Sequence, residues 1–209
     1  MTTTPTFSDG AATWNRRFET EAYVFGREPN AYLRANAAHL PRAGRALCVA
    51  DGEGRNSVWL AQQGLQVDAF DIAELGVAKA RKLAAEAGVS VNYSVADCDQ
   101  WPWPSEAYEA VVAVFVQFAD PAQRERLFAR MLAALKPGGV LLLLGYSPKQ
   151  LEYKTGGPGL VSHLYTPELL RSSFAALEIV ALDEYEAELA EGTAHAGRSA
   201  LIGLVARKP

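Results

Sequence analysis

Residues 46–57 read ALCVADGEGRNS, an apolar run that passes directly into a turn with two glycines. Gly52 and Gly54 stand where a strand must turn sharply into a helix, and glycine there permits positive φ and lets a ligand approach the backbone. In an open α/β sheet such a turn lies at the carboxyl end of a strand, where ligands bind. The stretch therefore predicts a strand, a tight turn and a helix beside a binding site, although a turn that binds nothing has the same pattern.

Strand and helix patterns alternate along the rest of the chain. Short apolar runs that predict strands occupy residues 46–50, 67–70, 89–95, 111–116 and 140–144. Helical spacing of apolar residues marks 73–87 and 121–135, with Asp120 expected as the N-cap of the second helix and KPGG at 136–139 as its stop. Strands that are apolar at nearly every position are buried on both faces, as in a parallel sheet covered by helices. The pattern predicts an α/β fold with a single doubly wound, mostly parallel sheet.

The two ends of the chain depart from this alternation. Residues 178–189 and 198–206 predict an antiparallel hairpin at the sheet edge, which brings the sheet to seven strands. The aromatic-rich N-terminal part predicts two short helices at residues 15–20 and 29–40. We expect residues 1–40 to form a helical lid segment and residues 41–209 the main domain.

Composition limits the partners. The chain of 209 residues is 49% hydrophobic and 21% charged, which is typical of one globular domain, and its net charge of −4 argues against nucleic acid as a partner. No apolar run approaches the ~18–20 residues that span a bilayer, and the N-terminus lacks a signal-peptide pattern. Two cysteines and three scattered histidines predict neither a disulfide framework nor a metal site. We expect a cytoplasmic protein that acts on a small molecule, with no nucleic acid and no membrane as partner.

Carboxylates end two further strands. Asp71 closes the second strand, where a carboxylate can accept hydrogen bonds from both hydroxyls of a ribose. Asp97 closes the third, where it can accept from an adenine amino group while the next backbone N–H, that of Cys98, donates to the ring. The alternatives are a helix N-cap for Asp71 and an ordinary turn for Asp97. Together with the glycine turn, the two carboxylates predict a site for adenosine.

The identity of the adenosine cofactor follows from what the turn lacks. A dinucleotide fingerprint needs a third glycine where this chain has Ser57, and no phosphate-binding loop is present. S-adenosylmethionine carries no phosphate, so the acidic residues Asp51 and Glu53 beside the turn are compatible with it. These observations favour S-adenosylmethionine as the cofactor.

With these marks the chain resembles the class I S-adenosylmethionine-dependent methyltransferases. The resemblance rests on Gly52-x-Gly54, Asp71, Asp97, the apolar run 111–116 and KPGG at 136–139, and it covers residues 40–209. It implies that the cofactor is bound by Ala50, Gly52, Gly54, Asn56, Asp71, Ile72, Asp97, Cys98 and Val114.

A narrower resemblance concerns residues 14–30. This stretch, together with residues 54–57, is similar to the small bacterial methyltransferases of the tellurite-resistance and thiopurine type, whose N-terminal segment caps the cofactor. It implies that the lid and substrate contacts are Trp14, Tyr23, Phe25 and Arg198.

Three departures from that pattern are informative. Ala50 stands where the family has its first glycine, and Cys48 where it has an acidic residue, so one cofactor contact is lost or replaced. Ala190-Glu191 replaces the His-Arg pair that the tellurite-type enzymes carry in the last hairpin, which makes tellurite an unlikely substrate. A second hypothesis, a degenerate cofactor-binding regulatory module without catalysis, rests on the first two departures. A third, a nucleotide-dependent oxidoreductase, is disfavoured by Ser57.

Methyl transfer from a sulfonium is a direct in-line displacement, so the protein mainly positions the acceptor and excludes water. We expect Tyr146 to face the methyl group and Gln117, after the fourth strand, to bond the substrate. His195, near the hairpin loop, is expected in a surface loop, with contact to an anionic substrate as the alternative. Because no His–carboxylate pair is evident, the sequence favours a small soft nucleophile, such as a thiol, a selenol or a related chalcogen species, that ionises without a base.

Overall fold

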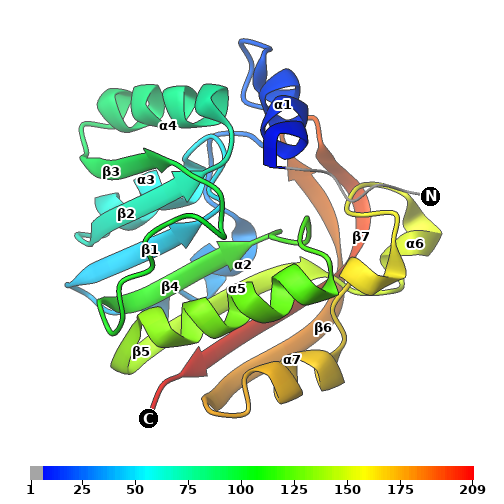
Figure 1. Ribbon diagram of the computed structural model, residues 1–209. Helices are drawn as coiled ribbons and strands as arrows, with labels where there is room; N and C mark the ends of the chain where they lie inside the picture. Colours follow the sequence, from blue (N-terminus) through cyan, green and yellow to red (C-terminus); the bar gives the residue numbers. More distant parts are fainter. Residues whose placement is uncertain (1–6) are drawn as a thin grey trace.

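The computed structural model describes residues 7–209, which form one seven-stranded sheet with helices on both faces (Figure 1). The strands are β1 (Arg45–Val49), β2 (Gln66–Asp71), β3 (Val91–Val95), β4 (Tyr108–Val114), β5 (Leu135–Tyr146), β6 (Glu178–Glu191) and β7 (His195–Arg207). Their order is β3-β2-β1-β4-β5-β7-β6. The first five strands run parallel, and β7 is antiparallel to both of its neighbours. The predicted doubly wound sheet with a C-terminal hairpin is confirmed.

Each face of the sheet carries its own apolar core. Helices α2 (Ala31–Ala35), α3 (Arg55–Gln62) and α4 (Glu74–Glu86) pack on one face, and α5 (Pro121–Ala134) and α7 (Pro167–Ser173) on the other. Alternate residues of β4 contribute to the two cores, Val112 to the first and Val111 to the second. This two-sided burial explains why the strands are apolar at almost every position.

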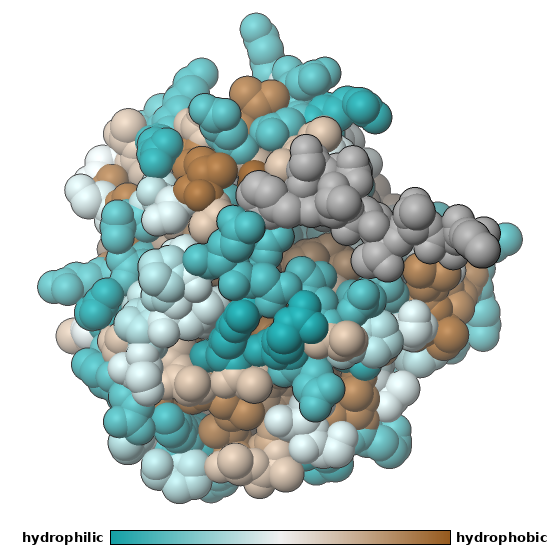
Figure 2. Space-filling view, viewed as in Figure 1, coloured by the Kyte–Doolittle hydropathy of each residue, from teal (hydrophilic) through white to brown (hydrophobic). Residues whose placement is uncertain are grey.

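The face of the molecule shown in Figure 2 contrasts with these apolar cores. The face in Figure 2 is mostly hydrophilic, and apolar side chains lie on it in small separate groups. None of the helices within residues 7–209 is both long and apolar enough to cross a membrane.

Most element boundaries lie close to the predicted ones. Asp120 caps α5 as expected, because its side chain accepts a hydrogen bond of 2.8 Å from the Gln123 N–H. The stretch 136–139 is not a free turn but the first part of β5, since Leu135 already pairs with Tyr108. Between the pairs Tyr108–Leu135 and Ala110–Val140 the register shifts, so residues 136–139 form an irregular part of β5 opposite a single residue of β4.

The N-terminal helices differ from the prediction. The first, α1 (Phe7–Phe18), begins well before residue 15 and ends where Phe18 is buried against Val24 and Ala73. The second predicted helix is broken into α2 and a 3-10 turn at Ala37–His39. In Figure 1, α1 lies beside α4, at the edge of the sheet where the parallel strands end.

The C-terminal hairpin is tighter than the sequence suggested. Strand β6 continues to Glu191 and β7 begins at His195, so the connection is only residues 192–194. The Val24 carbonyl accepts hydrogen bonds from the backbone N–H groups of Thr193 and Ala194, at 2.9 and 3.2 Å. The hairpin tip therefore closes against the lid segment, and Glu191 pairs directly with His195 across the ladder.

Candidate active site

The glycine turn at the carboxyl end of β1 is braced by Asp71. Gly52 and Gly54 adopt φ of +61° and +91°, as expected for a sharp strand-to-helix turn. The Asp71 carboxylate accepts hydrogen bonds of 2.9 Å from the N–H groups of Gly52 and Ala73. Burial raises the pKa of Asp71 to about 6, although these bonds lower it. Asp71 thus lies against the turn with its carboxylate ionised at neutral pH.

A second buried carboxylate lies inside the turn. Asp51 accepts a short hydrogen bond from the Ser57 hydroxyl, which is also bonded to the Tyr93 hydroxyl at 2.8 Å. Burial raises the pKa of Asp51 to about 7; the Ser57 bond opposes this shift and the Asp71 charge adds to it. Cys48 lies beside Asp51, and burial raises the pKa of its thiol. An acidic group is therefore present in the turn, three residues after the position at which the resemblance expects it.

The other predicted cofactor residues lie mostly at the ends of strands, and Asn56 bonds to the lid segment. Asp97 is half-buried and accepts a 2.6 Å bond from the Asp99 N–H, which is a local turn. Ile72 and Val114 are half-buried at the ends of β2 and β4. Cys98 is buried, and Asn56 is engaged elsewhere, because its side-chain oxygen accepts a 3.0 Å bond from the Asn30 N–H of the lid segment.

The charged residues of the turn hold the lid segment in place. Phe25 donates its N–H to Glu53 at 3.1 Å and accepts from Arg55 at its carbonyl oxygen at 3.0 Å. Glu53 also forms a 2.8 Å ion pair with Lys79 of α4. Tyr23 fastens the segment to α4 as well, since its hydroxyl donates to the Lys79 carbonyl at 3.2 Å. Tyr23 thus ties the N-terminal segment to α4, and its contact with a substrate stays a prediction.

Three aromatic rings surround the imidazole of His195. The centroid distances from His195 are 4.6 Å to Phe25, 4.3 Å to Phe115 and 5.9 Å to Tyr146. These rings come from the lid segment, from the residue after β4 and from the end of β5; we call Phe25, Phe115 and Tyr146 the aromatic cage. Trp14 and Phe18 continue the aromatic contacts outward, with Phe18 at 6.1 Å from Phe25. Trp14, Phe18 and Phe25 therefore form one aromatic cluster, and their role as a lid stays a prediction.

Behind the imidazole is a buried ion pair. Glu191 Oε2 lies 2.8 Å from Arg55 Nη2 and 3.7 Å from His195 Nδ1, while its Oε1 accepts a 2.9 Å bond from Asn30 Nδ2. Burial raises the pKa of Glu191, but the nearby His195 and the charge and hydrogen bond of Arg55 outweigh burial and lower it. Burial lowers the pKa of His195, and the charges of Arg55 and Arg17 add to this effect against that of Glu191. His195 is therefore neutral near pH 7.

His195 is the residue that the sequence analysis misjudged. It is only 8% exposed, whereas a surface loop was expected. Gly192 was the available signal: with φ of +65° it permits a short hairpin turn, which places residues 191 and 195 opposite each other. A loop of only three residues, 192–194, would have led to the prediction that Glu191 and His195 lie opposite each other at the tip of the hairpin.

The predicted catalytic residues have different surroundings. The Tyr146 hydroxyl is buried and has no hydrogen-bond partner among residues 7–209. Gln117 donates from its amide to the carbonyl oxygens of Tyr146 and His163, at 2.9 and 3.0 Å, and accepts from the Tyr146 N–H. These bonds hold Gln117 against the backbone of Tyr146, and its contact with a substrate stays a prediction. Arg198 is exposed and is paired with Glu186 at 2.9 Å.

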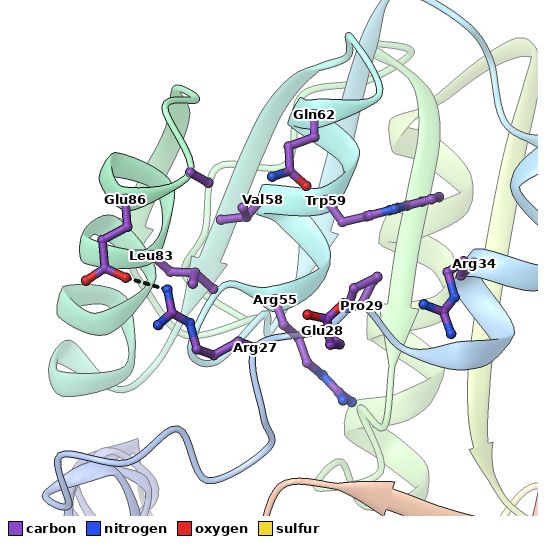
Figure 3. A pocket seen from close by; sticks show the side chains of 11 residues that line it. Arg27, Glu28, Pro29, Arg34, Arg55, Val58, Trp59, Gln62, Leu83 and Glu86 are labelled. Atoms are coloured by element: carbon purple, nitrogen blue, oxygen red, sulfur yellow. Dashed lines mark hydrogen bonds and ion pairs between the residues drawn. The ribbon is translucent and has the colours of Figure 1, made fainter.

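A surface hollow of about 260 Å³ lies on the other side of Arg55 (Figure 3). It is bounded by the lid segment, α3 and α4, and none of the cage residues lines it. Figure 3 shows Arg27 directed at Glu86, while Arg55 extends past Pro29. The hollow therefore adjoins the lid but is separate from the cage.

Comparison with known proteins gives a consistent picture. Residues 46–139 match a methyltransferase domain family. The demethylmenaquinone methyltransferase of Thermus thermophilus is 31% identical over 128 residues, 60% of this chain and 56% of the relative. A structure solved under the description "Conversion of a Disulfide Bond into a Thioacetal Group during Echinomycin Biosynthesis" has a TM-score of 0.76 at 18% identity, covering 95% of this chain and 90% of that one. TehB from Haemophilus influenzae has a TM-score of 0.69 at 16% identity, covering 96% and 68%.

The solved structures and the curated relative support different conclusions. The two solved structures show that the fold is shared. The curated relative adds sequence similarity, and this chain spans a little over half of its length. Because one fold supports many activities, only the residues of the site can indicate the acceptor and the reaction.

Proposed function

Because this chain belongs to the class I S-adenosylmethionine-dependent methyltransferases, we propose that it transfers a methyl group from that cofactor to a small acceptor held in the aromatic cage. The observation that carries the proposal is the connection between the cage and the glycine turn. Phe25, one wall of the cage, is bonded through its backbone to Glu53 and Arg55 on either side of Gly54. A cofactor at the turn and an acceptor in the cage would thus be neighbours.

The residues of the sheet edge fit the cofactor chemically. The ionised carboxylate of Asp71 is suited to accept from ribose hydroxyls, and the half-buried Ile72 and Val114 offer apolar surface to an adenine ring. S-adenosylmethionine supplies an electrophilic methyl group on a sulfonium with a good leaving group. The faces of Phe25 and Phe115 suit a neighbouring cation, because aromatic rings attract positive charge.

The chain's own contribution is positioning and the exclusion of water. Gln117 fixes the backbone of Tyr146, and Gly157 lies against the Tyr146 ring so closely that an added Cβ would be 2.7 Å from it. The lid segment encloses the opposite side through Phe25. Holding an acceptor in line contributes up to ~7–11 kcal/mol of the barrier in well-oriented reactions.

Two classes of acceptor deserve a direct comparison. The absence of a base in the sequence pattern favours a soft nucleophile, a thiol, selenol or related species, and we retain it as a candidate. The flat rings of the cage favour an aromatic acceptor, and the name of the Thermus thermophilus relative specifies a quinone, demethylmenaquinone. A regulatory module without catalysis is the alternative function.

Calorimetry and product analysis separate these possibilities. We expect S-adenosylhomocysteine to bind and NAD not to bind. Incubation with S-adenosylmethionine and a panel of thiols, selenols, phenols, hydroquinones and amines, followed by mass spectrometry, should reveal a methylated product. Binding of S-adenosylhomocysteine with no product from any acceptor would favour the regulatory module, and tighter binding of NAD would contradict the proposal altogether.

A further inference from the structure

We propose that Arg130 of α5 and Trp103 position the Cys98 peptide, so that the cofactor site accepts adenine and rejects a base with the opposite hydrogen-bonding pattern. The inference rests on the methyl transfer proposed above and on the predicted contacts of Asp97 and Cys98 with the base. Arg130 and Trp103 would act through the peptide, as positioning residues and not as cofactor ligands.

The turn that follows β3 is fixed by its own hydrogen bonds. The Asp97 carbonyl accepts from the N–H groups of Gln100 and Trp101, at 3.0 and 2.8 Å. Peptide bonds in the described part of the chain are all trans, so the Cys98 N–H points opposite to the Asp97 carbonyl and away from the turn. The Asp99 N–H donates to Asp97 Oδ1 at 2.6 Å. Both groups predicted to meet adenine, the Asp97 carboxylate and the Cys98 N–H, are thus oriented before any ligand binds.

The Cys98 carbonyl accepts two further hydrogen bonds, both from side chains. Trp103 Nε1 donates to it at 2.8 Å and Arg130 Nη1 at 2.7 Å. The same nitrogen of Arg130 lies 2.6 Å from Asp99 Oδ1. Since a carbonyl oxygen has two lone pairs, these donors occupy both of its acceptor positions. The peptide that follows Cys98 is therefore held in one orientation by α5 and by Trp103.

This peptide lies close to the carboxylate that is predicted to bind the ribose. The Ala96 N–H donates to the Asp71 carbonyl at 2.9 Å. Burial raises the pKa of the Cys98 thiol, and the charge of Asp71 is among those that add to the rise. Trp101 stacks on Phe70, the residue before Asp71, with ring centroids 4.8 Å apart. The turn after β3 and the end of β2 therefore form one continuous wall of the predicted cofactor site.

Two bases distinguish a fixed peptide from a flexible one. Adenine presents an amino donor and the ring acceptor N1, whereas hypoxanthine presents a carbonyl acceptor and an N1–H donor. An ionised carboxylate only accepts hydrogen bonds and a backbone N–H only donates them. Asp97 and Cys98 in their fixed orientation thus match adenine and oppose hypoxanthine. A site whose polar groups would be left unpaired rejects the wrong ligand strongly.

Removal of a donor to the Cys98 carbonyl should reduce this discrimination. Without Arg130 or the Trp103 indole N–H, the peptides beside Cys98 can turn and pair with water. Adenine then loses a preoriented partner, and hypoxanthine no longer faces a fixed opposing group. The affinities for the two bases should approach each other, whereas a general loosening of the fold would weaken both alike.

Calorimetry at pH 7 with S-adenosylhomocysteine and S-inosylhomocysteine, which carries hypoxanthine instead of adenine, measures the preference. We expect wild type to prefer the adenine compound at least about a hundredfold. Arg130→Met and Trp103→Phe should each lower this preference at least about fivefold. Trp103→Phe retains an aromatic ring beside Trp101 and removes only the donor, so it tests the inference without an unpaired charge.

Arg126→Met is the matched control on the same helix. Arg126 bonds to Asp99 at 2.8 Å, as Arg130 also does at 2.6 Å, but its printed partners do not include the Cys98 carbonyl. Its exposed ion pair should contribute little, so the base preference should stay within about twofold of wild type. Arg130→Lys, which retains a donor, should recover part of the preference lost in Arg130→Met.

An NMR measurement observes the Cys98 N–H directly. The chain has two cysteines, so labelling with ¹⁵N-cysteine gives two amide signals, which Cys48→Ala assigns. S-adenosylhomocysteine should move the Cys98 signal downfield, as a new hydrogen bond does, and S-inosylhomocysteine should not. The downfield shift should be smaller in Arg130→Met and in Trp103→Phe.

The outcomes separate this inference from the proposed function. Equal preference in wild type and Arg130→Met, or a wild type that does not distinguish the two ligands, would overturn the inference and leave the methyl transfer intact. Equal losses in Arg126→Met and Arg130→Met would also overturn it, because the ion pair with Asp99 would then account for the effect. A wild type that binds neither ligand would remove the proposed function as well.

Discussion

We expect Glu191 to contribute strongly to the free energy of unfolding, because its single carboxylate contacts three parts of the chain. It pairs with Arg55 of α3 at 2.8 Å, accepts from Asn30 of the lid segment at 2.9 Å and faces His195 of β7. The Arg55 side chain is only 7% exposed. Glu191→Ala would leave this guanidinium buried, with the Phe25 carbonyl as its remaining hydrogen-bond acceptor.

The expected loss follows from the cost of an unpaired buried charge. Removing one partner of a buried pair costs about 3–5 kcal/mol. For a domain of this size each kcal/mol corresponds to roughly 2–4 °C, so the midpoint of thermal unfolding should fall by roughly 6–20 °C. The lowered pKa of Glu191 sets the pH range: its stabilising contribution is complete at neutral pH and is lost as the pH falls below the usual range of a glutamate.

Urea unfolding at pH 7 and again at pH 3.5 measures both effects. Glu186→Ala is the matched control, since Glu186 pairs with the exposed Arg198 on the same hairpin and its removal should cost far less. The double variant Arg55→Met/Glu191→Leu should regain most of the stability lost in Glu191→Ala, because it leaves no buried charge. A loss below about 1 kcal/mol in Glu191→Ala would refute the description of this cluster as a buried, mutually dependent pair.

Three further predictions concern the glycine turn and the lid. Asp71→Ala should raise the dissociation constant of S-adenosylhomocysteine at least about tenfold, or about 1.4 kcal/mol, by calorimetry, and unchanged affinity in the folded variant would count against a ribose contact. The pKa of Asp51 is raised to about 7, so its contribution to stability is complete below about pH 4 and is lost as the pH rises through 7. The thermal midpoint of wild type should fall between pH 5 and 8, and Asp51→Asn should flatten that decline; identical slopes would contradict the assignment. Hydrogen exchange of residues 7–30 should slow when S-adenosylhomocysteine is added, and equal exchange with and without it would argue against a lid.

The strands could be predicted because burial on both faces produces a recognisable pattern in neighbouring residues. A strand covered on both faces must be apolar at successive positions, and β1, β4 and β5 are. The glycine turn and Asp71 at the end of β2 were predictable for a similar reason, since each follows such a run directly. The early start of α1 also had a local trace, since Phe7, Ala11, Trp14 and Phe18 follow helical spacing, but the sequence analysis placed this helix only at residues 15–20.

The buried polar cluster could not be predicted from neighbouring residues. Glu191 lies 136 positions from Arg55 and 161 from Asn30 along the chain, so no local pattern pairs them. Glu191 and His195 are polar and stand at strand ends, where exposure is the usual expectation. The contact of the hairpin tip with Val24 and the contacts of Asn30, Arg55 and Phe25 bring them inward. The burial of His195 was missed because it depends on contacts distant in sequence.

The structure of the turn explains how the chain accommodates Cys48 and Ala50, two departures from the family pattern. Ala50 has φ of +48°, a left-handed conformation that costs a non-glycine residue about 1–2 kcal/mol. The turn holds it there through bonds from the Asp51 N–H to the Phe70 carbonyl and from the Gly52 N–H to Asp71. Asp51, buried beside Cys48, supplies the carboxylate that the first strand lacks. A carboxylate is thus present three residues after Cys48, which weakens the support that the two departures give to a module without catalysis.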